Sequence, residues 1–223
     1  MVNVENYKKI IDELGNKVTL VAVSKTKPVE DILDLYSLGH RDFAENYVQE
    51  LVDKAGQLPK DIRWHFIGHL QTNKVKSIAP FVQLIQSVDS LKLLKEINKQ
   101  GEKQSKVIDC LLQAHIAEEE TKFGLDEREI NELINQWPDM KMNNVRICGL
   151  MGMASFTDDT NKVRSEFGYL KTLFDKFSQQ QTSNFKLQTL SMGMSSDYRI
   201  AIEEGSNMVR IGSLLFGERE KKG

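Results

Sequence analysis

A lysine at the end of an apolar run is the first feature of the sequence that points to chemistry. The run VTLVAVSK, residues 18–25, is rich in β-branched side chains, as in a strand buried on both faces, yet it ends in Lys25. Val21 and Val23 share strand parity with Lys25, so its ammonium group rises from the core if they point inward. Desolvation beside the charge of Lys27 would activate this amine as a Schiff-base nucleophile. A lysine that simply leaves the sheet for solvent explains the stretch alone equally well.

Two segments rich in glycine and serine near the end of the sequence indicate where an anion could bind. LSMGMSSD precedes a predicted helix, and VRIGSLLFG follows it; both offer backbone N–H groups and hydroxyls, and the second adds a guanidinium. The residues concerned are Gly193, Ser195, Ser196, Arg210, Gly212 and Ser213. Either segment alone could be an ordinary turn. Together with a strand-end lysine they predict a phosphorylated carbonyl ligand, of which pyridoxal 5'-phosphate is the commonest cofactor.

The rest of the chain alternates short β-rich runs with longer amphipathic helical patterns. We expect eight strands, at residues 18–24, 42–46, 62–68, 82–89, 106–116, 145–154, 186–193 and 207–217. Helical patterns lie at residues 7–14, 29–39, 90–100, 126–137, 162–177 and 196–205. Strands joined by helix-sized crossovers form a parallel sheet, so the α/β fold expected is a single (β/α)8 TIM barrel, with an open doubly wound sheet as the alternative. In such a barrel the site lies at the carboxyl ends of the strands, and phosphate is commonly held after strands seven and eight.

Length and composition favour one domain, residues 1–223, with an extra helix before the barrel. The chain has 223 residues, 28% of them charged, and a formal net charge of -2, which disfavours binding to nucleic acid or an anionic membrane. We find no signal peptide and no apolar run near the ~20 residues of a membrane span, and therefore expect a cytoplasmic protein. Cys110 and Cys148 lie in apolar runs and are expected to be reduced, structural thiols.

Other polar or soft side chains have structural interpretations of their own. The acidic run within residues 115–124 is more typical of a solvated loop than of a metal site. His65 and His69 have the spacing of metal ligands on a helix, but their segment has the pattern of a strand end followed by a turn, which disfavours zinc. Four methionines near strand ends could line a ring pocket or fill gaps in the core: Met151, Met153, Met192 and Met194.

Six motifs, in the same order along nearly the whole chain, resemble the pyridoxal phosphate homeostasis protein family, relatives of the barrel domain of bacterial alanine racemase. They are AVSKTKP, FAENYVQE, WHFIGHLQTNK, GLMGM, LSMGMSSD and VRIGSLLFGER. The resemblance implies a barrel of the alanine racemase N-terminal domain type, which binds pyridoxal phosphate as an aldimine on Lys25 and has no established turnover. It also places Asn46 and His65 at strand mouths, either as ring contacts or as packed core residues. FAEN, where many relatives have FGEN, and GLMGM depart from the family pattern away from the lysine and the phosphate loops.

Motifs and resemblance together predict a cytoplasmic monomer that buffers, stores or delivers pyridoxal phosphate, with apo enzymes that use this cofactor as its recipients. The predicted cofactor contacts are Lys25, Asn46, His65, Met192, Gly193, Ser195, Ser196, Arg210, Gly212 and Ser213. One alternative is an amino-acid racemase, which needs a proton acceptor on one face of the α-carbon and a proton donor on the other. Another is a Schiff-base aldolase or a phosphosugar isomerase, which would bind a sugar phosphate. Lys27 is the rival attachment lysine, and its place beside Pro28 favours an outward side chain.

Overall fold

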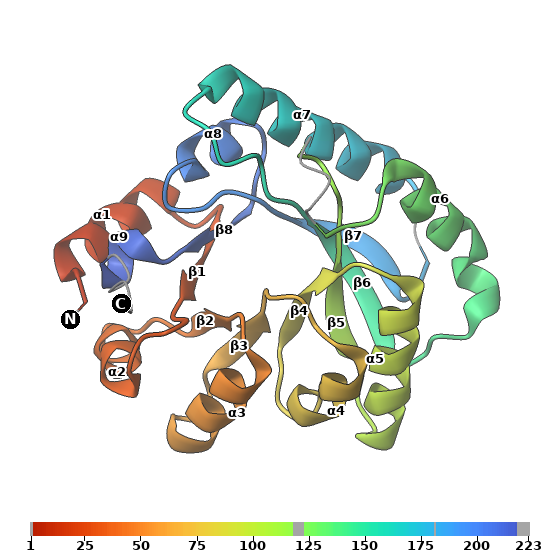
Figure 1. Ribbon diagram of the computed structural model, residues 1–223, viewed down its shortest axis with the longest axis horizontal. Helices are drawn as coiled ribbons and strands as arrows, with labels where there is room; N and C mark the ends of the chain where they lie inside the picture. Colours follow the sequence, from red (N-terminus) through yellow and green to blue (C-terminus); the bar gives the residue numbers. More distant parts are fainter. Residues whose placement is uncertain (1, 118–122, 181, 218–223) are drawn as a thin grey trace.

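The alternation of strands and helices closes into a barrel of eight parallel strands (Figure 1). The computed structural model describes residues 2–117, 123–180 and 182–217. Each strand pairs with the next along the chain, and the last returns to the first, which confirms the barrel over the open sheet. The strands are β1 (Thr19–Val23), β2 (Asp42–Glu45), β3 (Arg63–Phe66), β4 (Leu84–Val88), β5 (Ile108–Gln113), β6 (Val145–Met151), β7 (Phe185–Ser191) and β8 (Met208–Ile211).

Helices surround the ring of strands in Figure 1 and cover its outer face. Their buried residues recur at helical spacing, as Ile32 and Leu35 do, and these apolar stripes pack against the barrel. The α-helices are α1 (Val4–Leu14), α2 (Val29–Ser37), α3 (Val48–Gln57), α4 (Val75–Ile78), α5 (Leu91–Lys103), α6 (Glu127–Gln136), α7 (Thr160–Phe177), α8 (Tyr198–Glu203) and α9 (Ser213–Phe216). Two short 3-10 turns, η1 (Thr72–Lys74) and η2 (Trp137–Met140), adjoin α4 and α6.

The barrel interior contains a small apolar cluster to which six strands contribute one side chain each. Its members are Val21, Ala44, Leu84, Leu111, Met151 and Met208. Val23 packs against this cluster. Since alternate residues of a strand point to the same face, the inward pair in β1 confirms the parity expected for the run that leads to Lys25.

The end of the last strand differs from expectation. We predict a strand over residues 207–217, but β8 ends at Ile211 and α9 follows. The Leu215 and Phe216 N–H groups both donate to the Gly212 carbonyl at 2.9 Å. This turn buries both side chains against the core, with the Asn3 N–H donating to the Leu215 carbonyl at 2.7 Å. An apolar run of this length fits a buried helical turn as well as a strand, so composition alone misassigned it.

Both cysteines are free thiols on opposite faces of the sheet. Cys110 belongs to the outer core and Cys148 packs against the interior cluster. Burial raises the pKa of Cys148 to about 11 and that of Cys110 well above its usual value. Neither thiol is set up as a nucleophile, in agreement with the structural role expected for them.

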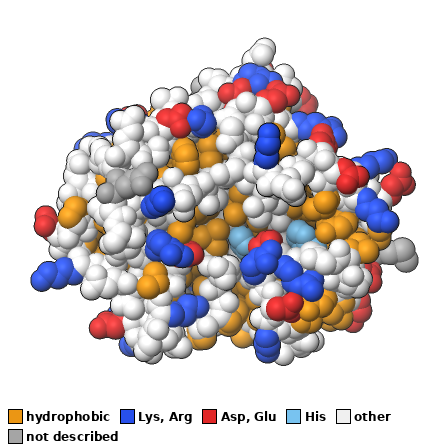
Figure 2. Space-filling view, turned by 180° about the vertical axis from the view of Figure 1, so that it is seen from behind, with side chains coloured by type: hydrophobic (Ala, Val, Ile, Leu, Met, Phe, Trp, Pro, Cys, Tyr) orange, Lys and Arg blue, Asp and Glu red, His pale blue; other side chains and the backbone are white. Residues whose placement is uncertain are grey.

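The surface of the described residues carries charges of both signs. On the face turned away from the viewer of Figure 1, acidic and basic side chains lie interspersed (Figure 2). None of the helices in the described ranges combines the length and apolarity that a membrane span requires. The acidic run of residues 118–120 lies outside the described residues, so its interpretation as a solvated loop stays a prediction.

Candidate functional site

A cavity of about 560 Å³ opens where several strands reach their carboxyl ends. It is lined by residues at the ends of β1 and β8 and by residues that follow β1, β2, β3, β6, β7 and β8. The lining consists of Val23, Lys25, Lys27, Asn46, Ile67, Met153, Phe156, Met194, Ser195, Ser196, Arg210, Gly212, Ser213, Leu214 and Gly217. Seven of the ten predicted contacts are therefore brought to one cavity: Lys25, Asn46, Ser195, Ser196, Arg210, Gly212 and Ser213.

Lys25 reaches this cavity because of where β1 ends. The strand stops at Val23, and Lys25 lies two residues further along with the same parity as the interior side chains. Its side chain is half-buried on the cavity wall. An amine in such a place can react with a carbonyl compound that enters the mouth of the barrel.

The same cavity is lined by two loops whose groups suit an anion: the serine loop, residues 194–197, and the glycine loop, residues 212–214. Ser195 and Ser196 line the cavity in the first, and Gly212 and Ser213 in the second. The loops are joined directly, since the Gly212 N–H donates to Ser195 Oγ at 3.2 Å. The first N–H groups of a helix have no acceptor inside it, so the start of α9 adds donors at the same wall.

Two predicted contacts, Met192 and Gly193, precede the serine loop and do not line the cavity. Met192 is fully buried in the outer core. Gly193 has φ +97°, and a Cβ built on it would lie 2.6 Å from Ala201 Cβ, so it allows the chain to turn tightly against α8. Met194, the next residue, faces the cavity in their place.

Arg210 is buried beneath the glycine loop. Its Nη1 donates to Ser191 Oγ at 2.7 Å, and its Nη2 donates to the Gly152 carbonyl at 2.9 Å. Burial lowers the pKa of Arg210 to about 10, against the attraction of Asp197, so the guanidinium stays charged at neutral pH. We expected this charge to serve the anion; these two bonds direct it partly to the barrel interior, and its contact with a ligand stays a prediction.

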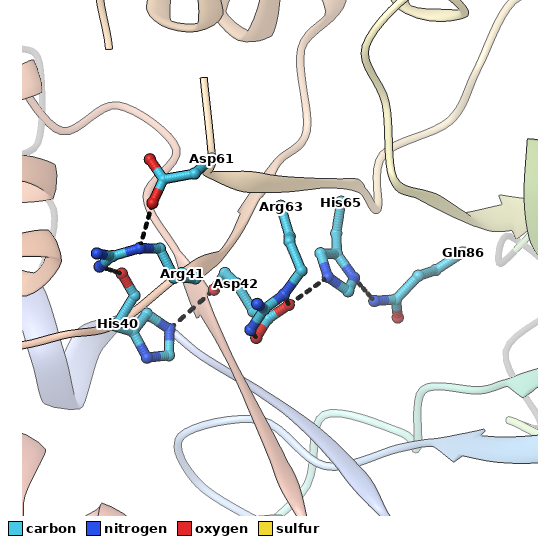
Figure 3. A network of polar contacts seen from close by, with 7 residues as sticks. All are labelled: His40, Arg41, Asp42, Asp61, Arg63, His65 and Gln86. Atoms are coloured by element: carbon cyan, nitrogen blue, oxygen red, sulfur yellow. Dashed lines mark hydrogen bonds and ion pairs between the residues drawn. The ribbon is translucent and has the colours of Figure 1, made fainter. Parts of the chain in front are cut away.

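From Ser191 a chain of hydrogen bonds runs through the barrel interior. Ser191 Oγ–H donates to Gln86 Oε1 at 2.7 Å, and Gln86 Nε2 donates to His65 Nδ1 at 2.9 Å. His65 Nε2 then donates to Asp42 Oδ1 at 3.2 Å (Figure 3). Burial opposes ionisation of Asp42, but hydrogen bonds from Arg63 and His65 hold the pKa of Asp42 well below its usual value.

His65 is therefore a packed core residue and not a cavity wall. Of the two roles left open for it, the structure favours the hydrogen-bonded one, because both ring nitrogens are engaged inside the barrel (Figure 3). His69 lies on the surface instead, 3.0 Å from Asp89. Among the described residues no group of three or more His, Cys, Asp or Glu side chains is placed to bind a metal.

The second lysine of the motif also faces the cavity, which corrects the outward position expected for it. Lys27 Nζ donates to the Phe216 carbonyl at the end of α9, at 2.8 Å, and this bond holds the side chain at the cavity. Ile67 and Phe156 are wall residues that we did not predict. Ile67 has the parity of His65 in β3, a signal present in the sequence. Phe156 is 90% exposed in the loop before α7, and no sequence pattern marks it.

Comparison with known proteins agrees with this geometry. Residues 3–220 match the family model described as alanine racemase, N-terminal domain. A pyridoxal phosphate homeostasis protein of Aquifex aeolicus is 40% identical over 97% of this chain and 95% of its own. The structure of PipY of Synechococcus elongatus with pyridoxal phosphate bound is 32% identical, with a TM-score of 0.86 over 96% of this chain and 99% of that chain.

An alanine racemase of Clostridium difficile shares only the fold. It is 14% identical, with a TM-score of 0.77, and the match covers 98% of this chain and 57% of that chain. The common part is the barrel, which agrees with the family model.

Proposed function

The chain belongs to the pyridoxal phosphate homeostasis proteins, within the alanine racemase N-terminal domain family, and from this premise we propose that it binds pyridoxal 5'-phosphate in the mouth cavity and takes part in homeostasis of this cofactor. One observation carries the proposal: Lys25, the serine loop and the glycine loop all line the same cavity. An amine and a set of N–H and hydroxyl donors around one cavity match an aldehyde and a phosphate on one small molecule.

The residues present fit such a group. The cavity volume of about 560 Å³ lies within the ~300–1,000 Å³ typical of small-molecule sites. Asn46 Oδ1 is buried and has no hydrogen-bond partner among the described residues, although Asn46 lines the cavity. A buried acceptor of this kind normally has a partner, and a polar ligand would supply one.

Each wall has its own task in this proposal. The cofactor, when bound, supplies an electrophilic aldehyde on a conjugated ring. Lys25 supplies the amine that holds it covalently, and the serine and glycine loops hold its phosphate through Ser195, Ser196, Gly212 and Ser213. Met153, Met194 and Ile67 give the ring an apolar surface.

We further propose that the protein is a cytoplasmic monomer, one domain over residues 1–223, which buffers or delivers the cofactor without turnover of amino acids. The name of its relatives supports a homeostatic role over an enzymatic one. Delivery asks only that an incoming amine attack the bond on Lys25. Lys27, on the same wall, is an amine within the site that could receive the cofactor in such a step.

Binding without turnover is tested on the wild-type protein. We expect visible absorbance on addition of pyridoxal phosphate, reactivation of an apo enzyme by the loaded protein, and no racemisation or keto-acid formation with L-alanine or L-serine. Free cofactor at equal concentration and borohydride-reduced protein, which cannot release its cofactor, are the controls. Racemisation near the ~10 s⁻¹ median of ordinary enzymes would refute the non-enzymatic role.

Ser213→Ala tests the glycine loop. A hydrogen bond to a charged group contributes about 1.5–3 kcal/mol, so we expect the dissociation constant for pyridoxal phosphate to rise by roughly one to two orders of magnitude. Affinity for pyridoxal, which lacks the phosphate, should not change. Ser183→Ala, at an exposed position away from the cavity, is the matched control. Equal losses for both ligands would show that Ser213 does not contact phosphate.

A further inference from the structure

The loop that carries Lys25, residues 24–28, is held by side chains from the next β/α unit. Ser24 Oγ–H donates to Glu45 Oε1 at 2.7 Å, and Lys54 Nζ donates to the Ser24 carbonyl at 2.8 Å. Glu45 ends β2 and Lys54 lies in α3. The residue before Lys25 is thus fixed through both its side chain and its backbone.

The residue after Lys25 is held by the same helix. The Thr26 N–H donates to Glu50 Oε1 at 2.6 Å. Thr26 has φ +64°, a conformation uncommon for β-branched residues that persists only where the surroundings hold it. The bond from Glu50 supplies one such constraint, directly beside Lys25.

Lys54 joins the two anchors into one cluster. Its Nζ lies 2.7 Å from an oxygen of Glu45 and 2.7 Å from an oxygen of Glu50, and its side chain is only 7% exposed. Burial raises the pKa of Glu45 to about 7, against the charge and hydrogen bond of Lys54. Removal of the ammonium would take away the donor shared by Glu45, Glu50 and the Ser24 carbonyl, and the buried Glu45 would then favour its protonated form.

None of these three residues lines the cavity in the part of the chain that the structure describes. We propose that Lys54, with Glu45 and Glu50, is a positioning residue that sets the reach of the Lys25 amine to the aldehyde of the cofactor. The inference rests on the proposed function. In this proposal the cluster affects how readily Lys25 forms the covalent bond, and it does not affect the binding of phosphate.

The test separates these two steps. Lys54→Met keeps most of the length of the side chain, which ends at the position of Cε, and removes the charged amine. Lys60→Met is the matched control, because Lys60 lies six residues after Lys54 and is exposed. It donates to the Ala55 carbonyl and not to the loop that carries Lys25. Two ligands are compared: pyridoxal phosphate, and pyridoxine 5'-phosphate, which has a hydroxymethyl group in place of the aldehyde.

We expect covalent attachment of pyridoxal phosphate, followed by absorbance and trapped with borohydride, to be about 10- to 100-fold slower in Lys54→Met. The dissociation constant for pyridoxine 5'-phosphate should stay within about twofold of the wild type. Lys60→Met should match the wild type in both measurements.

Glu50→Ala keeps the test decisive if Lys54→Met does not fold, since Glu50 is partly exposed. It removes the acceptor of the Thr26 N–H and should slow attachment with the same selectivity. Unchanged attachment rates in a folded variant, or parallel losses for both ligands, would overturn the positioning role. A wild-type protein that binds neither ligand would instead refute the proposed function itself.

Discussion

Replacement of Lys25 by alanine is expected to reduce the borohydride-stable incorporation of pyridoxal phosphate to background. Lys25 lines the same cavity as the serine and glycine loops, and alanine removes the nucleophile without adding bulk. The measurement is reduction of the loaded protein with borohydride, followed by peptide mapping. Non-covalent binding through the phosphate should survive, detectable with pyridoxine 5'-phosphate.

Lys27→Ala is the matched control for this experiment, because Lys27 lines the same cavity two residues away. Lys27 Nζ donates to the Phe216 carbonyl. We therefore expect the Lys27→Ala variant to carry the pyridoxyl label on Lys25 at the wild-type level. A pyridoxyl label on Lys27 alone in the wild-type protein would contradict the assignment of Lys25.

Gly212→Asp is expected to have the second largest effect, a loss of roughly a thousandfold in affinity for pyridoxal phosphate. Two like charges 4 Å apart repel by about 4 kcal/mol in partly screened surroundings, and the phosphate carries more than one charge. Gly212 is also the N-cap of α9, where an Asp side chain would accept the helix N–H groups offered to the phosphate. Equilibrium titration measures the change.

Gly212→Asn separates charge from size in the same place. A Cβ at this position would lie 3.2 Å from the Val23 carbonyl, so either side chain needs a small local adjustment. The neutral amide should bind the cofactor distinctly better than the carboxylate does, while thermal unfolding without ligand should be alike for the two variants. An unchanged dissociation constant in Gly212→Asp would show that phosphate is bound elsewhere.

The parts of the site that sequence predicts well are those fixed by strand parity. Val21 and Val23 point into the barrel, and the same parity predicts Lys25 at its mouth. The serine and glycine loops follow from the same rule, because parallel strands all bring their carboxyl ends to one edge. The periodicity of the chain favoured the barrel, and the pairing of β8 with β1 excludes the open doubly wound sheet that was its alternative.

The misassigned parts depend on contacts that a linear pattern does not contain. His65 follows its strand parity inward, but only the positions of Gln86 and Asp42 decide that its ring is engaged in the interior instead of facing a ligand. The apolar run after Gly212 is compatible with a strand and with a helix. In the folded protein it forms α9, which packs beside α1. Lys27 likewise turns inward because α9 presents a carbonyl to it.

The two halves of the site come from opposite ends of the chain and meet where the barrel closes. Lys25 follows β1 and Gly212 follows β8, and these strands pair directly, with Val21 beside Arg210. A nascent chain therefore cannot hold the cofactor until its last strand has left the ribosome and docked. A ligand bound to residues after both strands raises the free energy of unfolding of the closed barrel by RT ln(1 + [L]/Kd). It therefore opposes the separation of the first strand from the last.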